Sequence, residues 1–381
     1  KGRCIRRRLN AKHSAFRKLR TLSDFTQSAV ACQNGGVILT AKTTNSDDNR
    51  LVTIFGGGGY IGPIVAKRLL SFGYRVRIVE LFLYDTQNVM LSLFDNPCFE
   101  ILNGDLADAD VVAKGLQDAT DVVILAGLVG DPITKKYPDA HDAINETGIR
   151  DLVDHLNGRN LQRVIFISTC SNYGLIPEGT LADENYELNP LSLYAKAKVG
   201  IEQKLLSLKG QVDYEATALR FATAFGLAPR MRFDLTVSQF TREMYLRRDL
   251  LVYDADTWRP YCHVQDFADV IQRVLEAPAA DISFDVFNAG GDSNNFTKRM
   301  IIDAILKHIP DAPIAYQAHG TDPRNYRVDF KKIRERLGFT PRFSVEDGVR
   351  ELIRALDQNL FDDADIRANF YGNYEINYQK S

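Results

Sequence analysis

The chain has 381 residues, of which 45% are hydrophobic and 25% are charged, a composition typical of soluble globular proteins. This length predicts two domains, or one large domain with an appended lobe. No apolar run approaches the roughly 20 residues that a membrane-spanning helix needs. The five cysteines show no paired spacing, which disfavours a zinc site or a disulfide framework. We therefore expect a soluble, metal-free protein in a reducing compartment such as the cytoplasm.

Positive charge is concentrated at the start of the chain. Residues 1–50 carry 11 Lys and Arg against 3 Asp and Glu, whereas the remainder has ten more acidic than basic residues. An Arg-rich, acid-poor segment is typical of a mitochondrial-type targeting peptide, of a basic arm or of a disordered extension without a catalytic role. Because the body of the protein is acidic and lacks a basic stripe, nucleic acid is not expected as a partner.

Apolar runs alternate with amphipathic stretches from Leu51 onward. Strands are predicted at 51–55, 75–81, 98–104, 121–127, 163–169 and 215–221, and helices at 62–72, 109–117, 140–157, 193–209 and 236–248. Short apolar strands separated by helices predict a Rossmann-type, doubly wound parallel sheet in an α/β protein. After about residue 225 the pattern loosens, and helices at 331–337 and 345–356 are expected in a smaller C-terminal α/β lobe.

The first strand leads into a glycine-rich turn and then a helix, in LVTIFGGGGYIGPIVAKRLLSFG at residues 51–73. Gly56, Gly59 and Gly62 have GxxGxxG spacing. Glycines let the backbone turn tightly and approach a pyrophosphate, whose charge is favoured at a helix N-terminus. Because a strand precedes the turn and a helix follows it, this segment predicts a dinucleotide-binding loop.

Acidic residues at two later strand ends indicate which dinucleotide is bound. Glu80 ends the second strand, 18 residues after Gly62, where a carboxylate accepts hydrogen bonds from the adenosine ribose and repels a 2′-phosphate. No arginine follows in LFLYD, so NAD is predicted rather than NADP. Asp105 and Leu106, after the third strand, are placed to meet the adenine, although Asp105 alternatively caps a turn.

Tyr194 and Lys198 stand four residues apart in SLYAKAKVGIEQKLL, on one face of a predicted helix. Tyrosine has an ordinary pKa near 10, and a nearby ammonium together with the positive nicotinamide would stabilise its phenolate. Thr169, which ends the fifth strand, would hydrogen-bond the hydroxyl oxygen of the substrate from which Tyr194 takes a proton. This set suits hydride transfer at a sugar carbinol, in which Tyr194 removes the hydroxyl proton while C4 of NAD accepts the hydride.

With these residues in place, the chain resembles the extended short-chain dehydrogenase/reductases, specifically the NAD-dependent nucleotide-sugar epimerase/dehydratase family. The resemblance spans roughly residues 51–357 and is carried by FGGGGYIG, NGDLAD, VVILAGLVGDP, STCSNYG, YAKAK, LRFATAFG and WRPYCHVQDFADVI. It implies Thr169, rather than Ser168, as the catalytic hydroxyl, with Tyr194 and Lys198 as the catalytic pair. The cofactor-binding set is then Gly56, Gly59, Tyr60, Ile61, Gly62, Glu80, Asp105, Leu106, Ala126, Tyr194, Lys198 and Phe221.

The same resemblance implies how the chain is divided and how it binds its substrate. We expect an NAD-binding Rossmann domain at 51–225 and a mainly substrate-binding lobe at 226–381. This division allows a segment after residue 225 to return to the core sheet. The family's diphosphate-binding arginines match Arg259 and, more loosely, Arg324, since guanidinium groups pair bidentately with phosphate. Arg232 would reach the diphosphate or a substrate carboxylate, with a surface salt bridge as the alternative.

The two residues after Thr169 restrict the reaction. The family's 4,6-dehydratases place Asp-Glu there, whereas this chain has Cys170 and Ser171. Ser171 cannot act as the dehydratase base, so 4-epimerisation or ketone reduction is favoured over 4,6-dehydration. Packing or a substrate contact is preferred for Cys170, because family members with a cysteine acid/base carry it at the Ser171 position; an acid/base role is the alternative.

These interpretations predict an NAD-dependent epimerase or ketoreductase acting on a nucleoside-diphosphate sugar. The alternative is a non-catalytic dinucleotide-binding subunit of a larger assembly, attached through its basic arm. The intact set of Thr169, Tyr194 and Lys198 argues for the enzyme. Helices at 140–157 and 193–209 resemble those of the family's dimer interface, so a homodimer is expected.

Overall fold

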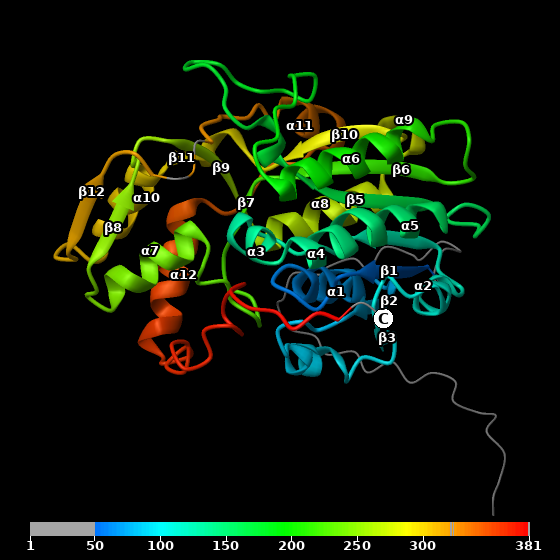
Figure 1. Cartoon of the computed structure of the whole chain (residues 1–381), viewed down its shortest axis with the longest axis horizontal. Coiled ribbons are helices and arrows are strands. Elements are labelled where there is room, and N and C mark those ends of the chain that lie inside the picture. The colour runs from blue at the N-terminus through cyan, green and yellow to red at the C-terminus, as the bar shows by residue number, and fades with distance from the viewer. Residues whose placement is uncertain (1–49, 321, 323, 380–381) are drawn as a thin grey trace, which may run out of the picture. The chain divides into compact units, whose positions relative to one another are not determined.

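The computed structural model describes residues 50–320, 322 and 324–379 (Figure 1). The predicted basic extension at 1–50 lies outside these described residues, apart from Arg50. Its role in targeting or attachment therefore stays a prediction.

A seven-stranded parallel sheet forms the centre of the fold (Figure 1). The strand order is β10-β6-β5-β4-β1-β2-β3, so successive strands build outward from β1 on one side and from β4 on the other. The strands are β1 Leu51–Phe55, β2 Arg75–Glu80, β3 Phe99–Asn103, β4 Asp121–Ile124, β5 Arg163–Thr169, β6 Glu215–Phe221 and β10 Asp285–Ala289. The predicted Rossmann-type sheet is confirmed, and the order reverses between β1 and β4, where such sheets bind ligands at their carboxyl ends.

Helices cover both faces of the sheet, which explains why its strands are nearly continuous apolar runs. All residues of β1 and β4 are buried. One face packs on α1 (Gly62–Ser71) and α8 (Val264–Glu276). The other face packs on α2 (Ala109–Leu116), α5 (Ile149–Asp154) and α6 (Leu193–Ser207). The N-terminus of α1, which follows the glycine turn, and that of α6, which follows Ser192, therefore lie beside the carboxyl ends of the strands.

The helix predicted at 140–157 is interrupted by a wide turn. It consists of α4 (Pro138–His141), a π-helical segment (Asp142–Gly148) and α5. Asn145 in the π-helical segment is buried and bonds both backbone groups of Leu128, accepting from its N at 2.6 Å and donating to its O at 2.9 Å. The wide turn therefore fastens the helix to the loop that follows β4.

The remaining elements form the smaller lobe and the connections. β9 (Trp258–His263) pairs with β7 (Thr223–Phe225) and β11 (Asn295–Thr297), and β8 (Leu250–Tyr253) pairs with β12 (Ile314–Gln317). β10 joins β6 in the central sheet, so the chain does cross back after residue 225. The domain boundary at 225 stays a prediction, because the described residues pack as one compact unit. These elements are α3 Asp131–Lys136, 3-10 helices Gln87–Leu93, Cys170–Tyr173 and Asp292–Asn294, β7 Thr223–Phe225, α7 Thr236–Tyr245, β8 Leu250–Tyr253, β9 Trp258–His263, α9 Ala279–Ile282, β11 Asn295–Thr297, α10 Lys298–Leu306, β12 Ile314–Gln317, α11 Lys331–Leu337 and α12 Val345–Asp357.

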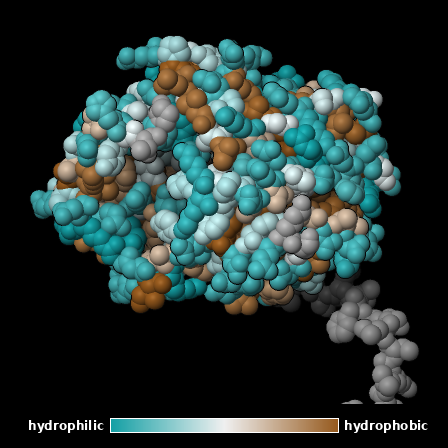
Figure 2. Space-filling view, in the orientation of Figure 1, coloured by the Kyte–Doolittle hydropathy of each residue, from teal (hydrophilic) through white to brown (hydrophobic). Residues whose placement is uncertain are grey.

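The described helices and the surface can be compared with what a bilayer would require. Within the described part of the chain, no helix combines the length and the apolar character needed to cross a bilayer. On the face shown in Figure 2, hydrophilic side chains predominate and hydrophobic residues lie in small separate groups. Scattered exposed apolar residues of this kind are normal for a folded protein in water.

Candidate active site

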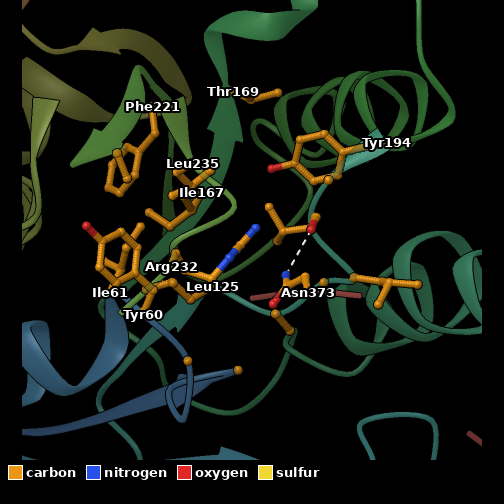
Figure 3. A pocket seen from close by; sticks show the side chains of 18 of the residues that line it. Tyr60, Ile61, Leu125, Ile167, Thr169, Tyr194, Phe221, Arg232, Leu235 and Asn373 are labelled. Atoms are coloured by element: carbon orange, nitrogen blue, oxygen red, sulfur yellow. Dashed lines mark hydrogen bonds between the residues drawn. The ribbon is translucent and has the colours of Figure 1, made fainter. Parts of the chain in front are cut away.

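A cavity of about 520 Å³ lies where the central strands end (Figure 3). It is lined by residues that follow or end the strands β1 to β6, together with residues of α6 and the smaller lobe. Every catalytic, cofactor-binding and substrate-binding residue predicted above lines this cavity except Gly62 and Cys170. The fold therefore brings the predicted residues together, while their individual roles stay predictions.

The glycine turn fits a bound dinucleotide. A Cβ atom at Gly62 would lie 2.1 Å from the Gly57 carbonyl oxygen, and one at Gly56, whose φ is +82°, would lie 2.3 Å from the Cα of Ala126. These two glycines let the turn close on itself and on the neighbouring loop. A Cβ at Gly59 would meet nothing within 4 Å, so this residue keeps the backbone open toward the cavity.

Backbone amides orient the carboxylate of Glu80 at the end of β2. Oε2 accepts a hydrogen bond from Gly58 N at 2.8 Å, and Oε1 accepts from Leu81 N at 2.9 Å and Phe82 N at 3.0 Å. A fixed negative charge at this edge of the cavity disfavours a 2′-phosphate, which fits NAD better than NADP. Asp105 also lines the cavity and caps a turn, because its Oδ1 accepts from Ala107 N at 2.9 Å.

Thr169 and Tyr194 point into the cavity from β5 and α6 (Figure 3). Lys198, one helical turn after Tyr194, donates to the Ala126 carbonyl oxygen at 3.3 Å. Its Nζ lies 5.9 Å from the centre of the Tyr194 ring and 4.8 Å from that of Phe166. The helix begins at this point because Ser192 caps it, accepting a hydrogen bond from Ala195 N at 3.2 Å.

Burial perturbs both titratable groups of this pair. Burial lowers the pKa of Lys198 from 10.5 to about 7. Burial also raises the pKa of Tyr194 above its ordinary value, Asp131 adds to the rise, and Arg232 opposes it. Strongly shifted groups that share a cavity are typical of functional sites. A cationic ligand group beside Tyr194 would lower its pKa toward the range in which it acts as a base.

The two neighbours of Thr169 in the sequence have other surroundings. Ser168 Oγ donates to Glu202 Oε2 at 2.6 Å and is buried. Cys170 is also buried, with its Sγ 3.1 Å from the Arg220 carbonyl oxygen, and burial raises the pKa of the thiol. This thiol does not line the cavity, and the choice between packing or substrate contact and an acid/base role for Cys170 stays a prediction.

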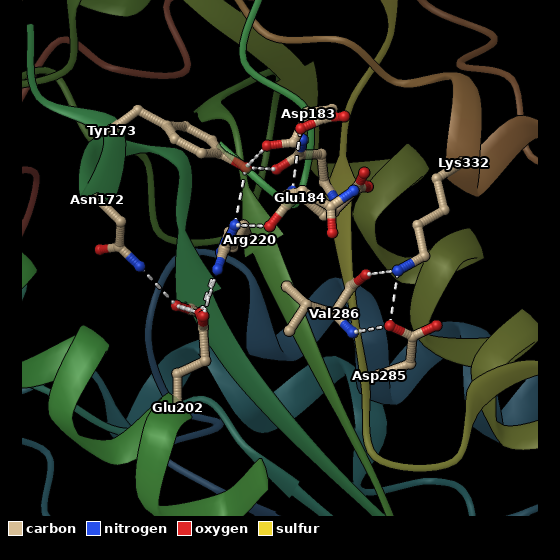
Figure 4. Close-up of polar contacts among 12 residues, drawn as sticks. Asn172, Tyr173, Asp183, Glu184, Glu202, Arg220, Asp285, Val286 and Lys332 are labelled. Atoms are coloured by element: carbon tan, nitrogen blue, oxygen red, sulfur yellow. Dashed lines mark hydrogen bonds and ion pairs between the residues drawn. The ribbon is translucent and has the colours of Figure 1, made fainter. Parts of the chain in front are cut away.

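Beneath the site lies a buried polar network that the sequence did not reveal (Figure 4). Arg220 on β6 pairs with Glu202 on α6 at 2.6 Å, with side-chain exposures of 5% and 2%. Arg220 also donates to the Tyr173 hydroxyl at 2.9 Å, which in turn donates to Asn288 Oδ1 at 2.7 Å. The network ties α6, the helix that carries Tyr194, to the sheet.

The predicted substrate arginines are each held by a carboxylate. Arg259 Nη2 and Arg324 Nε lie 3.1 and 2.8 Å from oxygens of Asp322. Arg232 makes two bonds of 2.6 Å to Asp234, and its guanidinium points into the cavity (Figure 3). All three arginines are largely buried. The Nε and Nη2 groups of Arg232 and Arg324 are already paired with Asp234 and Asp322, so binding of a substrate anion by these arginines stays a prediction.

Among the lining residues that the sequence analysis missed are Asn373 and Tyr374. They lie far along the chain from every motif of the site. No local pattern marks them, so only the tertiary structure places them here.

The comparisons with known proteins agree with this geometry. The model of the NAD dependent epimerase/dehydratase family matches residues 52–290, which is more than half of the chain. The chain belongs to this family. The predicted family is thereby confirmed, and NAD is confirmed as the family's cofactor.

Other proteins related in sequence or fold have different activities. A dTDP-glucose 4,6-dehydratase of Streptomyces niveus is 26% identical over 320 residues, covering 79% of this chain and 91% of the relative. A UDP-glucose 4-epimerase of Lactobacillus helveticus is 25% identical over 319 residues, covering 78% and 94%. The solved UDP-glucuronic acid 4-epimerase of Bacillus cereus, in complex with UDP-glucuronic acid and NAD, shares the fold with a TM-score of 0.73 at 22% identity, covering 81% of this chain and 99% of that one. The epimerase/dehydratase family thus contains similar relatives of both reaction types.

Proposed function

We propose that this family member is an NAD-dependent epimerase or ketoreductase of a nucleoside-diphosphate sugar. One observation carries the proposal: Thr169, Tyr194 and Lys198 share one cavity with the glycine turn and Glu80. A dinucleotide site beside a tyrosine and a lysine suits oxidation of a carbinol and reduction of the resulting ketone.

The residues present fit the cofactor. The open backbone at Gly59 would take the pyrophosphate and Glu80 the adenosine ribose, with Asp105 and Leu106 beside the adenine. NAD, when bound, supplies the position that accepts and returns the hydride. Lys198 would hold the ribose next to the reacting carbon, since its ammonium extends from α6 toward Ala126.

Tyr194 is proposed as the base that takes the proton of the substrate hydroxyl, and it returns that proton when the ketone is reduced. Thr169 would hydrogen-bond the same oxygen, and the ammonium of Lys198 would stabilise the phenolate. General acid–base catalysis of this kind contributes about 10²- to 10⁴-fold in rate. Arg259, Arg324 and Arg232 would bind the diphosphate or another anionic group of the substrate.

The carboxylates around the cavity support epimerisation or reduction over 4,6-dehydration. Positions 170 and 171 carry a buried thiol and a hydroxyl, and Ser171 Oγ lies 3.4 Å from Arg324 Nη1. Asp131, Asp234 and Asp322 line the cavity, but each pairs with an arginine. Although burial opposes the effect, the paired guanidinium groups lower the pKa of Asp234 and of Asp322, so these two carboxylates are weak bases.

We further propose a homodimer formed through α5 and α6, and a substrate-binding role for the lobe after residue 225. The dimer proposal follows from the resemblance of these helices to the family's interface helices. Size-exclusion chromatography with light scattering gives the oligomeric mass and tests it directly.

The proposed activity is tested on purified protein. Denaturation should release NAD or NADH, and the native protein should convert at least one of the UDP-, GDP-, dTDP- or CDP-sugars, followed by NMR and mass spectrometry. An epimerase shows no net change in NADH, whereas a reductase consumes it stoichiometrically. Tyr194→Phe should abolish turnover and keep NAD bound, while the exposed Tyr253→Phe serves as the matched control. Bound dinucleotide without turnover of any sugar would favour the alternative, a non-catalytic dinucleotide-binding subunit of a larger assembly. Absence of bound dinucleotide would refute the proposal.

A further inference from the structure

Residues 370–378, which we call the strap, are anchored at one end by Arg230. The Nε of this buried guanidinium donates to the Phe370 carbonyl oxygen at 2.9 Å. Its Nη2 donates to the Gly372 carbonyl oxygen at 3.1 Å and to Asn373 Oδ1 at 2.8 Å. These bonds commit the guanidinium of Arg230 to the strap, so its main role is to hold this segment.

The middle of the strap forms part of the cavity wall. Asn373 is only 7% exposed, and its Nδ2 donates to the Val129 carbonyl oxygen at 2.9 Å, in the loop after β4 (Figure 3). Its backbone N donates to Asp234 Oδ2 at 3.3 Å, the carboxylate that orients Arg232. Asn373 therefore connects the Rossmann side of the cavity to the smaller lobe, and Tyr374 lines the cavity beside it.

The far end of the strap packs on the Rossmann side. Ile376 is 9% exposed and belongs to a small apolar cluster with Leu128, Ile133 and Ala140. Tyr378 packs against the same cluster, as do Leu83 and Tyr84, which line the cavity after Glu80. Glu375 Oε1 also pairs with Lys136 Nζ of α3 at 3.0 Å. The strap thus crosses from the lobe to the side of the cavity where the adenosine half of a dinucleotide is expected.

We infer that the strap closes the cavity over bound NAD and limits how fast the cofactor leaves. This inference rests on the proposed function, because it takes the cavity to be the NAD site. Release requires the strap to open, and each contact that holds it closed lowers the fraction of open molecules. The family model ends at residue 290, so the strap lies outside the matched part of the chain.

The release rate of NADH tests the inference. Protein loaded with NADH is mixed with excess NAD, and the loss of bound-NADH fluorescence gives the rate. Lys136→Glu places like charges together at an exposed position and should speed release by about two- to fivefold, the range expected for a surface ion pair. Adding Glu375→Lys should return the rate to that of the wild type. The control is Lys307→Glu, which breaks the exposed pair with Glu346 outside the cavity and should leave the rate unchanged.

A second variant probes the apolar contact. Ile376→Ala removes buried side-chain volume from the strap anchor and should speed release by about tenfold or more. Unchanged release in both Ile376→Ala and Lys136→Glu, with NADH bound and sugar turnover intact, would overturn the strap while leaving the proposed function standing. Wild-type protein that binds no NADH would overturn both. The exposed charge pair keeps the test decisive even if Ile376→Ala does not fold.

Discussion

Replacement of Lys198 by methionine should make the stability of the NAD-free protein less dependent on pH. Burial lowers the pKa of this ammonium from 10.5 to about 7, which corresponds to about 5 kcal/mol favouring the neutral form. The lysine of the unfolded chain keeps its ordinary pKa, so the unfolded state binds more protons between pH 7 and 10.5. Burial of Lys198 therefore lowers the free energy of unfolding of the wild type by the full amount below pH 7. This penalty decreases as the pH rises from 7 to 10.5.

The magnitude follows from this difference in proton binding. The free energy of unfolding of Lys198→Met should exceed that of the wild type, and the excess should be largest at pH 7 and below. Loss of the hydrogen bond to Ala126 reduces this excess by about 1 kcal/mol. Between pH 7 and 9 the advantage of the variant should shrink by about 2 kcal/mol. The sign is opposite to that of a lysine stabilised by a carboxylate.

Urea unfolding of the NAD-free proteins at pH 7, 8 and 9 measures this difference. Lys196→Met is the matched control, because Lys196 is exposed on the same helix and its replacement should give no such pH dependence. If the difference in free energy of unfolding between wild type and Lys198→Met stays constant from pH 7 to 9, burial does not lower the pKa of Lys198 to about 7.

Three further substitutions test the cofactor loop and the buried network. Gly59→Ala should keep the melting temperature, because its Cβ would have no contact within 4 Å among the described residues, yet weaken NAD binding by about tenfold or more in calorimetric titration. Glu80→Ala should reduce the preference for NAD over NADP by about tenfold or more in competition titrations; an unchanged preference would remove Glu80 from the ribose site. Glu202→Gln leaves Arg220 buried without its ionic partner and should lower the free energy of unfolding by about 3 to 5 kcal/mol in urea; a loss below about 1 kcal/mol would show that the network does not secure α6.

The parts of the site that the sequence predicted depend on local patterns. The glycine turn has fixed spacing between a strand and a helix, and Tyr194 and Lys198 share one helical face, so both could be recognised without a structure. The parallel sheet followed from apolar strands that alternate with helices, since burial on both faces requires such strands.

The parts that the sequence did not reveal depend on contacts between distant residues. Asn373 bonds Val129 across 244 positions, and Arg220 pairs with Glu202 across two different elements, so neither contact leaves a local pattern. Such contacts become visible only when the fold places the segments together.

The most direct test of the proposed chemistry is turnover of nucleotide sugars in D₂O, followed by NMR and mass spectrometry. Transfer of a hydride away from the sugar and back predicts epimerised product whose carbon-bound hydrogens all remain protium, with no such product from Tyr194→Phe. Ketone reduction predicts a reduced sugar and matching NADH consumption. A dehydrated keto sugar that carries solvent deuterium on carbon would contradict the account, because water would then have been removed by proton abstraction from carbon.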